Sequence, residues 1–370
     1  MKNKFYSLDK IKKHNADYYF IIGERSNGKT YSVKMEMLKE YFKSGEVNQS
    51  ALLRRWDEDF KGIRGSNMFS DIVANGELKK LCGDKYDDIQ YFRHAWYLSK
   101  KNEETGKSVK AEKPFCYAFS ITAMEHDKST SYPNVTTVLF DEVLTRKQYV
   151  PDEFILFMNC LSTIIRERDN VTIYMLGNTV SHFSPYYSEM GLKHIRDMKQ
   201  GDIDTYSYGE SGLRVAVEYI GESKFLKKSN KYFAFDNPKL NMIKSGAYEL
   251  DIHPHLTKRY KTSDILFMYF ICYEEYILQC EVIQVDGEKL PEIFTYIHEK
   301  TTELKQPDDD LIFTTEITSQ HNKRVGILKP RDKMGEKVAW FYKHNLVFYQ
   351  NNEIGEIVSN YIKDTDGVII

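Results

Sequence analysis

The sequence predicts an α/β fold in which a mostly parallel sheet is flanked by helices, followed by a smaller α+β domain. Apolar runs at 17–22, 136–140 and 171–176 are separated by segments of helical composition, which is typical of parallel βαβ units. From about residue 264 the apolar runs follow one another directly, as in antiparallel hairpins. At 370 residues the chain also exceeds the roughly 250 residues at which one core stops growing.

Composition and charge narrow the possible functions. Hydrophobic residues make up 41% and charged residues 29%, so the chain as a whole is globular rather than disordered. No apolar run approaches the roughly 18 residues of a membrane span, and the N-terminus lacks the apolar stretch of a signal peptide. We therefore expect a soluble, intracellular protein with no membrane partner. Because the net charge is −2, any contact with nucleic acid must come from local basic patches.

Neither the cysteines nor the histidines predict a metal site. The five cysteines form no CxxC pair and no zinc-ligand spacing with histidines, so we interpret them as reduced thiols. His253 and His255 flank Pro254 in a predicted turn, and the histidines are otherwise scattered.

The first element is a buried strand at 17–22, followed by a glycine loop and a helix from Lys29 to about Phe42. The loop fits GxxxxGK[ST], the P-loop motif, and it has the strand-loop-helix context that this motif requires. Its residues are Gly23, Glu24, Arg25, Ser26, Asn27, Gly28, Lys29 and Thr30. Backbone N–H groups and the helix N-terminus bind phosphate in such loops. We expect Lys29 to reach the β- and γ-phosphates of ATP and the Thr30 hydroxyl to bind Mg²⁺.

The strand at 136–140 ends in Asp141 and Glu142. Beside a P-loop, Asp141 is placed to hold Mg²⁺ through water, and Glu142 is placed to orient and deprotonate the attacking water. An acid pair at a strand end can also be a solvated turn. Together with the P-loop, the pair predicts the additional-strand, catalytic-glutamate type of P-loop NTPase and argues against a kinase or a GTPase switch.

A helix over 151–168 and a strand over 171–176 come next. The strand ends in Gly177 and Asn178, so Asn178 is a candidate sensor of the γ-phosphate, although Asn after Gly is also ordinary turn chemistry. The helix ends in Arg166 and Arg168. Arginines are favoured there by the helix dipole alone, or one of them is a finger that reaches the ATP of a neighbouring subunit.

The remaining segments define the expected domains. We expect a P-loop domain over 1–205, a connecting region over 206–260 and an α+β domain over 261–370. Within them we expect strands at 50–56 and 114–122 and an exposed loop at 99–113. Two antiparallel strands joined at Glu274 should begin after Asp264, with a hairpin-type turn at Asp286-Gly287.

With these residues in place, the chain resembles the DNA-packaging ATPases of small short-tailed phages with protein-primed genomes. The resemblance covers roughly residues 15–190. It is carried by FIIGERSNGKT, LLRRW, DKSTSYPNVTTVLFDE, YVPDE and TIIRERDNVTIYMLGNTVSHFSPYY, with a short echo in NLVFYQNNEI. The YPN before the acid strand is specific, since P-loop chemistry in general does not require it.

The resemblance implies roles for further residues. Arg25 matches a loop arginine that helps to hold nucleotide, and Lys128 matches a lysine that acts at the subunit interface. Arg166 aligns with the trans-acting finger and is preferred to Arg168 on that ground. Arg54-Arg55 match a basic pair that has two possible roles, contact with phosphate or stabilisation of the strand end.

The resemblance also implies partners and a place of action. We expect a homo-oligomeric ring of five subunits, double-stranded DNA and the capsid portal or connector as partners, and action in the host cytoplasm at the portal vertex of the procapsid. Whether a packaging RNA takes part stays open. The C-terminal domain of the family is similar to an RNase-H-type nuclease that has lost its metal-binding acids. Glu281 is the only acid within a predicted strand here, so we expect no nuclease activity.

Two basic segments are candidates for gripping DNA. One is the loop Lys61 to Gly65 and the other is the region 321–345, where seven Lys or Arg side chains outnumber two acids. Solvated faces produce such charge runs as well. The expected function is ATP-driven translocation of DNA into a procapsid. The alternatives are a ring helicase or chromosome-partition translocase, and a nucleotide-gated assembly protein with little turnover.

Overall fold

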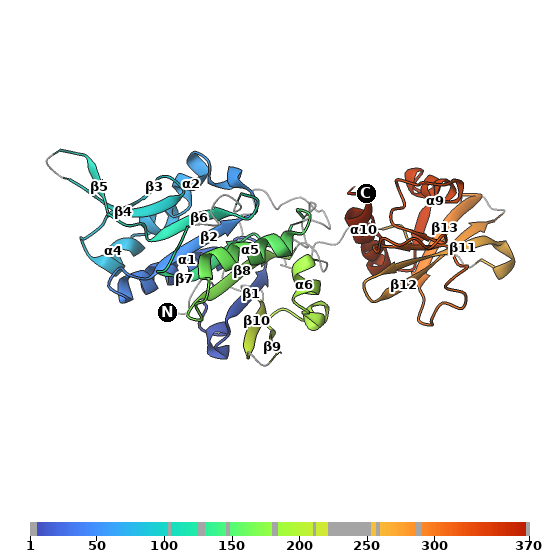
Figure 1. Ribbon diagram of the computed structural model, residues 1–370, viewed down its shortest axis with the longest axis horizontal. Coiled ribbons are helices and arrows are strands. Elements are labelled where there is room, and N and C mark those ends of the chain that lie inside the picture. The colour runs from blue at the N-terminus through green and yellow to red at the C-terminus, as the bar shows by residue number, and fades with distance from the viewer. Residues whose placement is uncertain are drawn as a thin grey trace, which may run out of the picture. The chain divides into compact units, whose positions relative to one another are not determined.

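The computed structural model describes residues 6–102, 105–123, 130–145, 149–179, 184–209, 212–220, 253–256, 260–285 and 291–367. The chain divides into two compact units, Met1–Glu249 and Leu250–Ile370, and each is described by itself (Figure 1). Within the described ranges, no helix combines the length and the apolar character that crossing a bilayer requires.

The first unit is built on a ten-stranded sheet, counted over the described residues (Figure 1). Its strand order is β3 (Asp88–Tyr91), β4 (Ala95–Lys101), β6 (Cys116–Ser120), β2 (Gln49–Arg54), β7 (Val135–Asp141), β8 (Thr172–Asn178), β1 (Tyr18–Gly23), β10 (Leu213–Tyr219) and β9 (Ile203–Tyr208), and β5 (Ser108–Lys110) pairs with β4. The strands from β6 to β10 are parallel, and antiparallel strands extend both edges. The predicted α/β arrangement is confirmed, and β8 lies between β1, which precedes the P-loop, and β7, which ends in the acid pair.

Helices cover both faces of this sheet. On β7, Leu139 belongs to the core that α1 (Lys29–Lys43) covers, whereas the ring of the next residue, Phe140, lies 5.0 Å from that of Phe157 on α5 (Glu153–Ile165). Successive strand residues point to opposite faces, so α1 and α5 cover opposite sides. The shorter helices are η1 (Ile11–His14), η2 (Asp57–Phe60), α2 (Ile63–Asn67), α3 (Ser70–Ala74), α4 (Glu77–Cys82), α6 (Pro185–Glu189) and η4 (Lys193–Arg196).

Two expectations about this unit were wrong. The segment 99–113 is not simply a loop, because β4 continues to Lys101 and pairs with β5 as a hairpin. Every residue of β5 is exposed, so no apolar alternation announces the strand. The predicted boundary at residue 205 cuts through β9, and the predicted connecting region contains β10, whose residues 215–219 are buried beside β1.

The second unit is an antiparallel meander with parallel strands added at its sides (Figure 1). Its strand order is β15 (Lys323–Arg324), β14 (Ile312–Thr314), β11 (Ile265–Tyr273), β12 (Tyr276–Gln284), β13 (Ile293–Glu299) and β16 (Val347–Tyr349). Its helices are η5 (Thr262–Asp264), α9 (Lys333–Lys343) and α10 (Asn352–Asp366). The predicted pairing of β11 with β12 about Glu274 is confirmed, and the predicted turn at Asp286-Gly287 lies outside the described residues.

Candidate nucleotide site

The residues of the P-loop motif form a turn between β1 and the start of α1. Gly28 has φ of 94°, in the left-handed region that favours glycine, and it caps the N-terminus of α1. The ammonium of Lys29 folds back over the loop and donates to the carbonyls of Gly23 (3.1 Å) and Glu24 (2.8 Å). Burial lowers the pKa of Lys29 to about 8, against the opposing effect of the Asp141 carboxylate. The loop therefore holds a desolvated cation ready for an anion.

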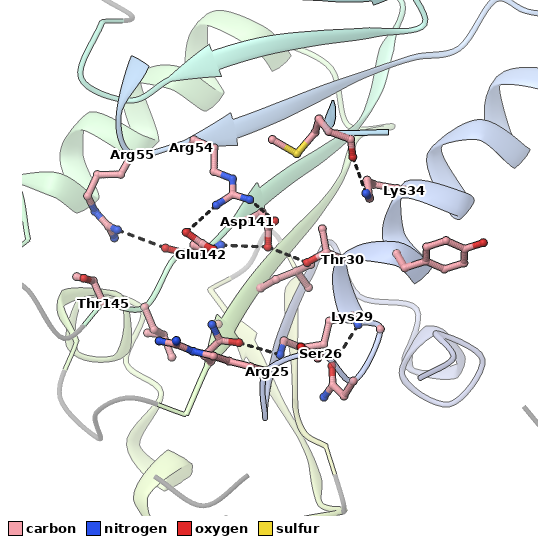
Figure 2. A pocket seen from close by; sticks show the side chains of 18 of the residues that line it. Arg25, Ser26, Lys29, Thr30, Lys34, Arg54, Arg55, Asp141, Glu142 and Thr145 are labelled. Carbon is pink, nitrogen blue, oxygen red and sulfur yellow. Dashed lines mark hydrogen bonds and ion pairs between the residues drawn. The ribbon is translucent and has the colours of Figure 1, made fainter. Parts of the chain in front are cut away.

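Two neighbouring strands bring their polar ends to the same loop. Thr30 Oγ1 donates to Asp141 Oδ1 at 3.1 Å, and Lys29 Nζ donates to Asn178 Oδ1 at 3.2 Å (Figure 2). Because parallel strands β1, β7 and β8 end at the same edge, residues 111 and 149 positions apart meet there. The structure thus brings together the predicted nucleotide residues from three segments.

Glu142 occupies a restrained position directly after β7. Its φ is 62°, which is uncommon for a residue other than glycine. Its carbonyl accepts from Arg55 Nη1 at 3.3 Å, and the carbonyl of Val143 accepts from Arg55 Nη2 at 2.8 Å. The Glu142 side chain is 62% exposed and faces the cavity. The turn therefore presents a carboxylate to solvent while its backbone is held from behind.

The arginine pair at the end of β2 divides between two tasks. Arg54 turns into the site, where its guanidinium lies 2.8 Å from Asp141 Oδ2 and 2.7 Å from Glu142 Oε2 (Figure 2). Arg55 instead forms a buried ion pair with Glu153 at the start of α5, with contacts of 2.7 and 2.8 Å. The sequence left open whether the two arginines contact phosphate or stabilise the end of the strand. In the structure Arg54 points into the site, and Arg55 stabilises the end of the strand.

These residues line a cavity of about 870 Å³. Its walls include predicted residues of the loop, the acid pair and Asn178, and also residues that the sequence did not suggest. The latter are Tyr31, Lys34, Arg64, Asn67, Met68, Leu144, Thr145 and Leu176. Among the predicted loop residues, Arg25, Ser26, Asn27 and Gly28 line the cavity, whereas Glu24 faces Lys29 through its carbonyl.

Arg64 belongs to the segment predicted to grip DNA. It lines the nucleotide cavity and donates to the Glu58 carbonyl at 3.2 Å. Lys34 of α1 anchors the same region by donating to the carbonyl of Met68 at 2.6 Å and to Asp71. The sequence does not indicate this contact, because Lys34 and Met68 are 34 residues apart.

Arg166 and Arg168 lie beyond the end of α5, and their surroundings differ. Arg166, with φ of 54°, caps the helix, and its guanidinium donates to the carbonyl of Thr130 at 3.0 Å. Arg168 donates to the carbonyls of Ile164 (2.7 Å) and Ile165 (3.1 Å), and also to those of Tyr132 and Val135. Both line a second cavity of about 840 Å³ that shares none of its lining residues with the first.

Comparison with known proteins connects this geometry to a family. A family profile described as podovirus DNA encapsidation protein (Gp16) matches residues 1–365. The chain belongs to this family.

Individual relatives of this encapsidation protein are distant. It is 29% identical to the DNA packaging protein of Bacillus phage B103 over 253 residues, which cover 58% of this chain and 68% of the relative. It is 28% identical to the DNA packaging protein of Bacillus phage phi29 over 191 residues, half of each chain. A solved structure of the phi29 viral genome packaging motor assembly matches with a TM-score of 0.60 and 20% identity, covering 98% of this chain and 100% of that chain. The Phi-28 gp11 packaging motor matches with a TM-score of 0.56, 18% identity and coverage of 98% and 99%. These structural matches show a shared fold over nearly the whole length.

Other predicted residues of the encapsidation protein belong to other segments of the chain. Lys128 is outside the described residues. In the second unit, Glu281 accepts from Gln279 Nε2 at 2.6 Å and from Tyr260, and His298 Nε2 lies 3.4 Å away. No group of three or more His, Cys, Asp or Glu side chains suited to a metal ion occurs among the described residues. In the basic region 321–345, Arg324 is paired with Asp332.

Proposed function

We propose that this encapsidation protein is an ATPase that drives double-stranded DNA into a viral procapsid as a ring of subunits. The observation that carries the proposal is the meeting of Lys29 and Thr30 with Asp141 beside an exposed Glu142. In P-loop motors this set binds the phosphates and the metal and supplies the base for hydrolysis. Membership of the DNA encapsidation family supplies the context in which such hydrolysis is useful.

The residues of the cavity fit ATP with magnesium. A hydroxyl and a carboxylate oxygen, Thr30 Oγ1 and Asp141 Oδ1, lie together at 3.1 Å, and oxygen ligands are what Mg²⁺ prefers. Two buried donors on the cavity wall, Asn27 Nδ2 and Arg54 Nε, have no hydrogen-bond partner among the described residues. Phosphate oxygens would satisfy both, which removes the cost of burying them unpaired. When bound, magnesium neutralises charge on the β- and γ-phosphates.

Glu142 is the group that would accept a proton from the attacking water. In the nucleotide-free arrangement its carboxylate is tied to Arg54, which also holds Asp141. Arg54 therefore neutralises the exposed carboxylate of Glu142 until its guanidinium turns toward phosphate. Asn178, which accepts from Lys29, is placed to respond when Lys29 leaves the loop carbonyls for the γ-phosphate.

Arg166 is the group that would complete the site of a neighbouring subunit. Helix α5 has 13 residues and starts at Glu153, whose partner Arg55 holds the Glu142 carbonyl. At about 1.5 Å per residue, Arg166 lies roughly 20 Å along the helix from that end. It cannot reach its own cavity across that distance, so it acts in trans if it acts on ATP. Arg168 is engaged by four carbonyls and is the less available of the two.

Further partners follow from the family context. Contacts with DNA would be made to phosphates, because packaging must accept every sequence. The segment Lys61 to Gly65 and the region 321–345 are the candidate surfaces. The capsid portal or connector, a pentameric ring and, in some systems, a packaging RNA complete the assembly, which would act in the host cytoplasm at the portal vertex. The meander with added parallel strands supports a vestigial RNase-H-type fold for the second unit.

The test is phosphate release by the purified chain, with and without duplex DNA and procapsids. We expect release that DNA and procapsids stimulate, and protection of the DNA from nuclease as it enters the capsid. The Glu142→Gln variant is the control for contaminating activity. Stimulation by DNA without any effect of procapsids would favour a helicase or partition translocase, and ATP binding without release would favour a nucleotide-gated assembly protein.

A subunit-mixing experiment tests the trans role of Arg166. Arg166→Ala and Glu142→Gln subunits should each be inactive, whereas their mixture should recover hydrolysis at sites that combine an intact Glu142 with a neighbour's Arg166. A mixture as inactive as its components would remove the shared site from the proposal.

A further inference from the structure

A buried polar cluster lies directly behind the nucleotide site. We call it the Arg55 cluster and define it as the side chains of Arg55, Glu153 and Tyr186 with the carbonyls of Glu142 and Val143. Glu153 is fully buried and accepts from Arg55 Nε (2.8 Å), from Arg55 Nη2 (2.7 Å) and from the Tyr186 hydroxyl (2.8 Å). Fold stability alone is a weak reason for such a cluster, because apolar residues of similar volume are often as stable as a buried ion pair.

The cluster joins three segments that the nucleotide site uses or adjoins. Arg55 directly follows β2 and its neighbour Arg54 faces the acids, while its own guanidinium holds the turn at Glu142. Glu153 is the first residue of α5 and also accepts from the backbone N–H of Val150 at 2.9 Å. Tyr186 belongs to α6, the helix that follows β8 and Asn178 in the sequence. A movement of the turn at Glu142 therefore acts directly on the start of α5.

Helix α5 carries that movement to its other end, where Arg166 lies. A tilt of about 5° at one end of a rod roughly 20 Å long shifts the other end by about 1.7 Å. Misplacing a reacting group by about 1 Å can change a rate by a factor on the order of 100. Small changes at the Arg55 cluster are thus sufficient to place or withdraw Arg166.

We propose that the Arg55 cluster couples the hydrolysis site of each subunit to the position of its own Arg166, so that the nucleotide state of one subunit sets the rate of its neighbour. This rests on the trans role of Arg166 proposed above. Arg55, Glu153 and Tyr186 are positioning residues in this scheme, since they act through the turn at Glu142 and through α5.

The first test measures the coupling within one subunit and does not depend on any trans effect. Amide hydrogen exchange is followed at Arg166 and Arg168, whose N–H groups donate to Ser162 and Ile165, with and without a non-hydrolysable ATP analogue and magnesium. We expect the analogue to change exchange there by about fivefold or more, and Tyr186→Phe to abolish that change. Absence of any change in the parent protein, or an identical change in Tyr186→Phe, would overturn the coupling.

The second test measures the effect on the neighbour. Glu142→Gln subunits serve as donors of Arg166, and Arg166→Ala subunits serve as acceptors. Adding Tyr186→Phe to the donor should lower hydrolysis by the mixture about tenfold, because only delivery of Arg166 is affected in a subunit that is already inactive. Tyr19→Phe is the matched control, since Tyr19 is also buried and its hydroxyl accepts from the N–H of Ala16, far from α5 in the sequence.

The outcomes separate the two proposals. Full activity with the Tyr186→Phe donor, together with none when the donor also lacks Arg166, would overturn the coupling and leave the trans finger standing. Full activity with a donor that lacks Arg166 would overturn the finger, and with it the effect on the neighbour. Thermal unfolding and binding of a fluorescent ATP analogue by the Tyr186→Phe subunit show whether it is folded and loaded in both tests.

Discussion

Replacing Glu153 with glutamine should strongly destabilise the first unit while leaving its nucleotide cavity lined by the same side chains. The substitution conserves shape and removes one charge. It leaves the Arg55 guanidinium, which is 9% exposed, without a counter-charge. It also turns one acceptor oxygen into an NH₂ group that faces donors, because the arginine can only donate.

The magnitude follows from the burial of both partners. Removing one member of a buried ion pair costs about 3–5 kcal/mol. For a unit of this size, about 1 kcal/mol corresponds to roughly 2–4 °C in Tm, so we expect a decrease of roughly 6–20 °C. Replacing Arg55 and Glu153 together by methionine should cost less than the sum of the single changes by about 2 kcal/mol or more, because neither charge is then left alone.

The assay is urea and thermal unfolding followed by tryptophan fluorescence. Trp56 and Trp96 report on the first unit, and a Trp340→Phe background removes the signal of the second. A Glu153→Gln variant within about 1 kcal/mol of the parent would refute the reasoning. So would a double replacement whose cost equals the sum of the two single ones.

The remaining predictions concern the site itself. Burial lowers the pKa of Lys29 to about 8, and only the ammonium form attracts phosphate, so ATP affinity should fall up to about tenfold per unit as pH rises above 8. Binding of a fluorescent ATP analogue checks this, and Lys29→Ala should bind about 10–100-fold more weakly with no such slope. Glu142→Gln should retain ATP binding while steady-state phosphate release falls by a factor on the order of 100 or more. Arg168→Ala should cost about 2 kcal/mol in thermal unfolding through its carbonyl contacts, whereas Arg166→Ala, with one exposed contact, should stay within about 0.5 kcal/mol.

The central sheet could be predicted because its strands are buried on both faces. Such strands appear in the sequence as continuous apolar runs, and β1, β7 and β8 all do. The edge strands could not be predicted in the same way. In β5 every side chain is exposed, and β9 alternates between half-buried and exposed positions, so neither leaves an apolar signal.

The candidate site was predictable to the extent that it lies in motifs. Lys29 and Thr30 follow from the P-loop motif, Asp141 and Asn178 follow from strand ends, and the structure brings the four side chains together. The wall formed by Arg64 and its neighbours was not predictable, because nothing local to that segment indicates a phosphate cavity. The difference between Arg166 and Arg168 also required the fold, since both follow the same helix and only their carbonyl partners distinguish them.

The two arginines at the end of β2 connect the acid pair with the start of α5. Arg54 is the last residue of β2 and turns toward the acid pair, whereas Arg55 follows the strand and turns toward Glu153. Arg54 pairs with the carboxylates of Asp141 and Glu142, which would bind metal and activate water. Arg55 donates to the carbonyls of Glu142 and Val143 and also pairs with Glu153 at the start of α5. If Arg54 leaves these carboxylates for phosphate, the turn at Glu142 loses one of its contacts. Arg55 holds the backbone of that same turn. The proposed coupling between hydrolysis and the placement of Arg166 therefore needs only this shared turn and α5.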